Sequence, residues 1–180
     1  MGVQIGRARL SKRRYLEVMS SVQDEEVLRR LREAYRDLGI ENESFDFRDM
    51  IHAVGSPLDA LMYSTLFWPQ FVEIDGMIFL EGTIEDEEDR QRLEEVFAKY
   101  DEDVARTEQD FNLVEVPSDL FGRRAGNTTE EEDRRLAERL AEMWRARLDL
   151  LYPGREFVVQ VLEPEETGGE VGIVFFQGKR

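Results

Sequence analysis

Two residue types that carry much of protein chemistry are scarce in this chain, which has no cysteine and a single histidine, His52. Without cysteine there is no disulfide framework, no thiolate nucleophile and no zinc site of the cysteine type. A lone histidine rules out a two-histidine metal site within one chain and makes His52 the only candidate for a catalytic histidine. We therefore expect neither a metal nor another cofactor, and the lack of cysteine is compatible with a reducing compartment.

Long apolar runs are missing as well. No stretch of about 18 apolar residues occurs, so the sequence predicts no membrane-spanning helix. Residues 1–15 lack the apolar run of roughly 7 to 15 residues that marks a secretory signal, and we expect the protein to be cytoplasmic. We expect these residues to form a basic N-terminal arm ahead of a single acidic domain over residues 16–180. The basic residues of the arm are Arg7, Arg9, Lys12, Arg13 and Arg14.

The common signatures of nucleotide binding, acyl transfer and zinc proteolysis are also absent: GxGxxG, GxxxxGKS/T, GxSxG and HExxH. The segment around Asp75-Gly76 faintly echoes a calcium loop. Placing Gly76 at the required sixth position, however, puts Phe71 at the first ligand position and Gly82 at the twelfth. Motifs therefore assign neither a catalytic residue nor a metal ligand, and Asp75-Gly76 is better read as a hairpin turn.

Acidic residues dominate what is present, because 40 Asp and Glu stand against 24 Lys and Arg, for a formal net charge of −16. Such a surface repels nucleic acid and anionic membranes, since phosphate-binding proteins gain affinity from clustered Lys and Arg. The charge favours a basic protein as the partner. A salt-adapted archaeal protein would also be rich in acid and poor in lysine, with its charge merely solvated, and the sequence leaves both alternatives open. The bias of basic residues toward arginine suggests a GC-rich bacterial source.

Apolar residues recur at three- and four-residue steps in about five segments, which predicts helices there. The broadest apolar stripe includes Leu140 and Trp144, so we expect that helix to pack against a sheet and to carry much of the core. The predicted helices cover residues 24–38, 47–54, 57–68, 85–104 and a last segment that starts at Thr128 or Thr129 and ends at Pro153.

Runs of β-branched and aromatic residues predict about five strands. Two of them are separated by Asp75-Gly76, a pair that accepts positive φ in a two-residue hairpin turn. Residues 118–127 have the composition of a turn. Strands grouped in hairpins with helices between them predict an α+β fold, with an antiparallel or mixed sheet of about five strands packed by about five helices. The predicted strands are residues 71–74, 77–80, 113–116, 156–162 and 171–176.

The candidate site is a line of carboxylates. A seven-residue spacing places Glu88, Glu95 and Glu102 on one face of the long helix predicted over residues 85–104, opposite its apolar stripe. Runs of charge are usually solvated helix faces, and this remains the alternative interpretation. Trp68, where a helix ends before Pro69, either anchors a partner or closes the core. The predicted partner-binding residues are Glu88, Glu95, Glu102, Glu85, Asp86 and Trp68.

These features favour a non-catalytic, acidic, cytoplasmic protein-binding domain, such as an immunity-type inhibitor that covers a basic partner, for instance a toxin. One alternative is an enzyme of unfamiliar type, a hydrolase or transferase that uses the carboxylates of Glu73, Asp75 or Glu81 with His52 as acid or base. Another is a structural or assembly subunit. The sequence gives no indication of the oligomeric state.

Overall fold

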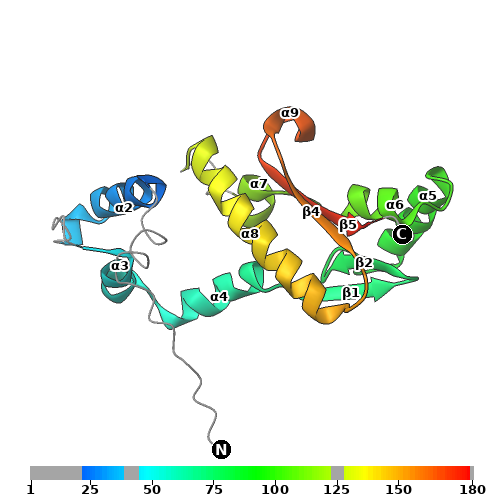
Figure 1. Cartoon of the computed structure of the whole chain (residues 1–180), viewed down its shortest axis with the longest axis horizontal. Coiled ribbons are helices and arrows are strands. Elements are labelled where there is room, and N and C mark those ends of the chain that lie inside the picture. The colour runs from blue at the N-terminus through cyan, green and yellow to red at the C-terminus, as the bar shows by residue number, and fades with distance from the viewer. Residues whose placement is uncertain (1–21, 39–44, 123–127, 179–180) are drawn as a thin grey trace, which may run out of the picture. The chain divides into compact units, whose positions relative to one another are not determined.

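The computed structural model describes residues 22–38, 45–122 and 128–178. The contacts of the chain divide it into two compact units, residues 1–57 and residues 58–180 (Figure 1). The basic arm predicted for residues 1–15 lies outside the described residues. The arm and the single domain over residues 16–180 therefore stay predictions.

The first unit contains α2 (Val22–Ala34), the short 3-10 helix η1 (Arg36–Leu38) and α3 (Phe47–Val54). Leu28 of α2 and Met50 of α3 share a small core. Asp46 caps α3, since its carboxylate accepts from the backbone amide of Asp49 at 2.9 Å while Asp49 accepts from the amide of Asp46 at 3.2 Å. This reciprocal pair satisfies amides that the first helical turn leaves without partners. The helix predicted over residues 24–38 is confirmed up to Ala34.

The second unit holds two antiparallel sheets, which confirms the α+β class. β1 (Phe71–Ile74) and β2 (Met77–Leu80) form a hairpin, and β3 (Leu113–Glu115), β5 (Gly172–Gln177) and β4 (Phe157–Leu162) form a sheet in that order. The hairpin turn is the predicted one, because Asp75 and Gly76 have φ values of 50° and 82°. The five strands thus belong to a two-stranded and a three-stranded sheet rather than to the single sheet that was predicted.

The described residues contain eight α-helices, more than the predicted five. The predicted helix over residues 85–104 is wrong as one element, because α5 ends at Lys99 and α6 begins at Val104. Asp101 and Glu102 between them have φ values of 53° and 61°, in the left-handed region that ends a helix. The helices of the second unit are α4 (Pro57–Phe67), α5 (Glu87–Lys99), α6 (Val104–Phe111), α7 (Val116–Phe121), α8 (Glu130–Leu151) and α9 (Pro164–Thr167).

The main core of the second unit lies between α8 and the three-stranded sheet, where α8 packs along β4 (Figure 1). Leu140 and Trp144 are 0% and 1% exposed, which confirms their predicted place in the core. The indole of Trp144 meets the ring of Phe175 edge-on at 6.2 Å between centroids. Its Nε1 donates to the carbonyl of Leu66 at 2.8 Å, so one side chain both fills the core and attaches the end of α4.

A second, smaller core joins the hairpin to α5 and α6. Alternate residues of β2 point to opposite faces, so Ile78 enters the main core while Met77 and Phe79 enter the smaller one. Leu93 is 3% exposed and brings α5 into the same cluster. α5 is therefore held against the hairpin by its apolar side, and its acidic side faces away from this core.

Candidate functional site

The predicted acidic residues of α5 line a surface pocket of about 390 Å³, here called the acidic pocket. Glu88, Gln91, Arg92 and Glu95 follow the spacing that places side chains on one face of a helix. Four carboxylates and one guanidinium line the pocket, so its charge is negative. The acidic pocket is lined by Asp86, Glu88, Asp89, Gln91, Arg92 and Glu95.

Several of these side chains are held in place by the start of α5. Asp86 is the N-cap, and its carboxylate accepts from the amides of Glu88 at 2.9 Å and Asp89 at 3.0 Å. The partial positive charge at a helix N-terminus stabilises carboxylates there. Gln91 Nε2 donates to Glu95 Oε1 at 3.0 Å. By contrast, the carboxylate of Glu88 makes no hydrogen bond or ion pair with any residue in the described ranges, which leaves it available to a partner.

The other three predicted partner-binding residues do not line the acidic pocket. Glu102 is displaced from the line of Glu88 and Glu95 because it lies in the turn after α5. Glu85 is exposed just before the N-cap. Trp68 follows α4 and is 41% exposed, with the guanidinium of Arg147 lying 5.3 Å from its ring centroid. The structure thus brings together Asp86, Glu88 and Glu95, but not the whole predicted set.

A second pocket, of about 220 Å³, lies on another side of α5 and is here called the apolar pocket. Met77 and Leu93, each 3% exposed, belong to the smaller core and form the buried part of its lining. The charged residues of its lining are all exposed. The apolar pocket is lined by Ile74, Asp75, Met77, Arg90, Leu93, Glu94 and Phe97.

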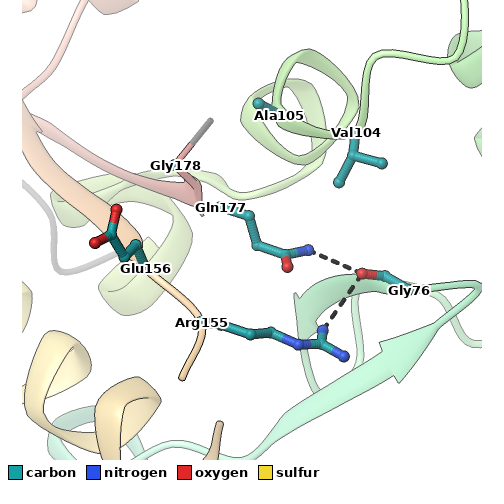
Figure 2. A pocket seen from close by; sticks show the side chains of 7 residues that line it. All are labelled: Gly76, Val104, Ala105, Arg155, Glu156, Gln177 and Gly178. Carbon is teal, nitrogen blue, oxygen red and sulfur yellow. Dashed lines mark hydrogen bonds between the residues drawn. The ribbon is translucent and has the colours of Figure 1, made fainter. Parts of the chain in front are cut away.

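A third pocket, of about 270 Å³, lies between the hairpin turn, the start of α6 and the end of β5. Figure 2 shows Arg155 and Gln177 reaching the carbonyl oxygen of Gly76 from two directions, at 3.4 Å from Nη1 and 2.8 Å from Nε2. Arg155 also pairs with Glu73 at 2.6 Å. These donors are thus already engaged with groups of the protein itself, and the contacts join the hairpin turn to β5.

Behind Gln177 lies the most deeply buried acid of the described residues, Glu108 of α6, which is 0% exposed. Its Oε1 accepts from the amide of Ile78 at 2.7 Å and from Gln177 Nε2 at 2.8 Å. Its Oε2 accepts from the amide of Gln177 at 2.6 Å. Burial raises the pKa of Glu108 above its ordinary value, while the hydrogen bonds from Gln177 and Ile78 oppose that change.

Asn112 lies one turn after Glu108 and is also fully buried. Its Nδ2 donates to the carbonyls of Ile78 at 2.8 Å and Phe175 at 3.3 Å. Its Oδ1 is buried without a hydrogen-bond partner among the described residues. Glu108 and Asn112 therefore bind both β2 and β5, and we call this pair the α6 clamp.

The α6 clamp was missed from the sequence because a glutamate in a strongly acidic chain suggests a solvated surface position. The sequence does contain one indication that Glu108 is buried. Glu108 shares the helix face of Val104, Phe111 and Asn112, so it lies within an apolar stripe rather than opposite one. Both oxygens of Glu108 are occupied by donors of the protein, which indicates a structural role in joining the two sheets.

The residues named for an enzymatic alternative are not assembled within the second unit. Glu73 is paired with Arg155, Asp75 lies in the hairpin turn, and Glu81 is exposed. His52 is exposed on α3 of the first unit. Among the described residues, no group of three or more histidine and carboxylate side chains is placed to hold a metal ion.

Comparisons with known proteins found no match to the chain among protein-family models, curated proteins or solved structures. No helix in the described part of the chain is long and apolar enough to cross a membrane.

Proposed function

We propose that this protein is a non-catalytic, cytoplasmic binding domain that attaches to a basic protein through the acidic pocket of α5. The observation that carries the proposal is the lining of that pocket, where four carboxylates face one guanidinium. The partner that fits is a protein with a basic cleft, such as a toxin whose active site an immunity-type inhibitor would cover. The net charge of −16 adds long-range attraction for such a partner.

The rigidity of α5 supports the same proposal. Asp86 caps the helix, and Leu93 and Phe97 fasten it to the hairpin. A surface that is already ordered loses little conformational entropy when it binds, so more of the interaction energy appears as affinity. Charged groups at such a surface chiefly raise the association rate and select the partner.

The test compares two doubly substituted variants that change the net charge equally. One carries Glu88→Lys and Glu95→Lys in the acidic pocket. Its matched control carries Glu138→Lys and Asp149→Lys, which are exposed on α8 and do not line the pocket. Tagged wild-type protein and both variants are used to capture partners from the source cell at low and high salt, and captured proteins are identified by mass spectrometry.

We expect a stoichiometric basic partner that the wild type and the control retain and the pocket variant loses. With that partner purified, the pocket variant should associate about tenfold more slowly at low salt, and the difference should shrink as salt screens the charges. Equal retention by both variants would show that the acidic pocket is not the binding site. Circular dichroism confirms in each case that the variant is folded.

A further inference from the structure

The apolar pocket combines a buried apolar lining with a charged mouth. Met77 and Leu93 are each 3% exposed, and Ile74 and Phe97 are partly buried beside them. Small-molecule sites usually have volumes of roughly 300–1,000 Å³, so a pocket of about 220 Å³ is better matched to one large side chain. Pockets of this kind, apolar inside and polar at the edge, receive the anchoring residues of protein interfaces.

The charges at the mouth indicate what kind of side chain fits. Asp75, Arg90 and Glu94 are exposed, and none of them forms an ion pair with a residue that the structure describes. Two carboxylates against one guanidinium give the mouth a negative charge, and the net charge of −16 has the same sign. A cation is therefore favoured, provided that its stem is apolar enough for the interior of the pocket.

We propose that the apolar pocket binds an arginine side chain of the basic partner, an inference that rests on the proposed function. Arginine has an apolar stem that can lie along Ile74 and Met77. Its planar guanidinium can pair with the carboxylates of Asp75 and Glu94. Phe97 supplies an aromatic ring to the lining of the pocket, and a guanidinium stacks on such a ring better than a lysine ammonium does.

The position of the two pockets on α5 suggests how one partner contacts both. The apolar pocket is lined on α5 by residues 90, 93, 94 and 97, and the acidic pocket by residues 88, 91, 92 and 95. The two sets have the same spacing but are shifted by two positions, which corresponds to a rotation of about 200° around the helix. The acidic pocket and the apolar pocket therefore lie on opposite sides of α5. Because the apolar side of α5 packs on the hairpin, a partner that contacts both pockets must extend around α5 from its acidic side toward the hairpin.

The experiment titrates the full-length, ¹⁵N-labelled protein with three capped amino acids and follows backbone amide shifts by NMR. The probes are the Nα-acetyl methylamides of arginine, lysine and norleucine. We expect the arginine probe to cause saturable shifts at Ile74, Met77, Leu93 and Phe97. Its affinity should exceed that of the lysine and norleucine probes by about threefold or more, because only arginine combines the apolar stem with a planar cation.

Substitutions then identify the carboxylates involved. Asp75→Asn keeps a residue type that tolerates the left-handed turn conformation, and Glu94→Gln keeps the shape of the side chain. Each should weaken the arginine probe by about two- to fivefold, as expected for an exposed charge pair. Glu87→Gln is the matched control, since it removes one charge from the same helix outside either pocket, and it should leave the affinity unchanged.

Two results would overturn the inference. One is that the arginine probe produces no saturable shifts at the apolar pocket. The other is that norleucine binds there as tightly as arginine, which would assign the pocket to an apolar side chain. Either result leaves the proposed function standing if the Glu88 and Glu95 variant still loses its partner. Retention of the partner by that variant would overturn the proposed function even where arginine fills the apolar pocket.

Discussion

Glu108 of α6 and Asn112, the C-cap of that helix one turn later, hold the two backbone groups of the same residue, since Ile78 donates its amide to Glu108 and its carbonyl accepts from Asn112. The same two side chains bind β5 through the amide of Gln177 and the carbonyl of Phe175. No strand ladder joins the two sheets in the described residues, so helical side chains make this connection instead. Substitutions at Glu108 therefore measure how much the α6 clamp contributes to the free energy of unfolding.

Glu108→Ala should destabilise the second unit by about 2–5 kcal/mol, because it leaves the buried amide of Ile78 and the partly buried amide of Gln177 without an acceptor and creates a cavity. Glu108→Gln should cost about 1–3 kcal/mol, since it replaces one acceptor oxygen by a donor. Denaturation with urea measures both changes. Gln109→Ala, exposed on the same helix, should lie within about 0.5 kcal/mol of the wild type. A silent Glu108→Ala would show that the clamp is dispensable.

The Arg134 and Glu163 pair should make stability depend on pH in the acidic range. The hydrogen bond from Arg134, at 2.6 Å, lowers the pKa of Glu163 below its ordinary value of 4.5. A lowered folded-state pKa means that the stabilising contribution is present above pH 4.5 and is lost as the pH falls through the folded-state value.

Glu163→Gln should therefore lower the melting temperature at neutral pH, and its difference from the wild type should shrink steadily below pH 4.5. Differential scanning calorimetry between pH 3 and pH 7 provides the measurement. Glu165→Gln, exposed on α9, is the control and should show no such trend. If the melting temperature of Glu163→Gln lay below that of the wild type by the same amount at every pH, the assigned role of the ion pair would be contradicted.

The two tryptophans should differ in how much stability their substitution costs. Trp144→Phe removes the hydrogen bond to Leu66 from a residue that is 1% exposed, and should cost about 0.5–1.5 kcal/mol. Trp68→Phe, at a residue that is 41% exposed, should cost less. In fluorescence, the tryptophan left in the Trp68→Phe variant should emit at shorter wavelength and resist acrylamide quenching. Strong quenching of that variant would place Trp144 outside the core.

Removing the strain between α5 and α6 should stabilise the protein. Glu102 has a φ of 61°, which costs an L-residue roughly 1–2 kcal/mol, and glycine avoids most of this cost. Glycine also loses more backbone entropy on folding than glutamate does, which offsets part of this gain. Glu102→Gly should therefore raise the free energy of unfolding by about 0.5–1 kcal/mol in total. Gly76→Ala should lower the free energy of unfolding, because Gly76 has a φ of 82°. A destabilising Glu102→Gly would indicate that the side chain makes a stabilising contact.

Local signals in the sequence predicted the local elements. Asp75-Gly76 predicted the hairpin, and Thr128 or Thr129 predicted the start of α8, which the structure places after Thr129, because both depend on neighbouring residues alone. The local sequence around Pro117 was interpreted wrongly. It suggested only the end of a strand followed by a turn, whereas it lies in the first turn of α7, where its missing amide costs nothing.

The candidate site was predictable in part. The spacing of Glu88 and Glu95 correctly placed both on one face of α5. Glu102 was misplaced because the apolar stripe continues from Phe97 to Val104 through a turn that periodicity cannot reveal. The α6 clamp depends on Ile78 and Gln177, which lie far from Glu108 along the chain, so pairing them required the tertiary structure.

The α6 clamp also has a consequence for self-association. β3 covers the edge of β5 only up to Val174, and beyond it the carbonyl of Phe175 and the amide of Gln177 would be a template for a strand of another chain. Asn112 and Glu108 occupy these groups, and they occupy the matching groups of Ile78 on β2. Two side chains of one short helix thereby close two sheet edges at once, and their loss would expose both to the strand pairing that begins aggregation.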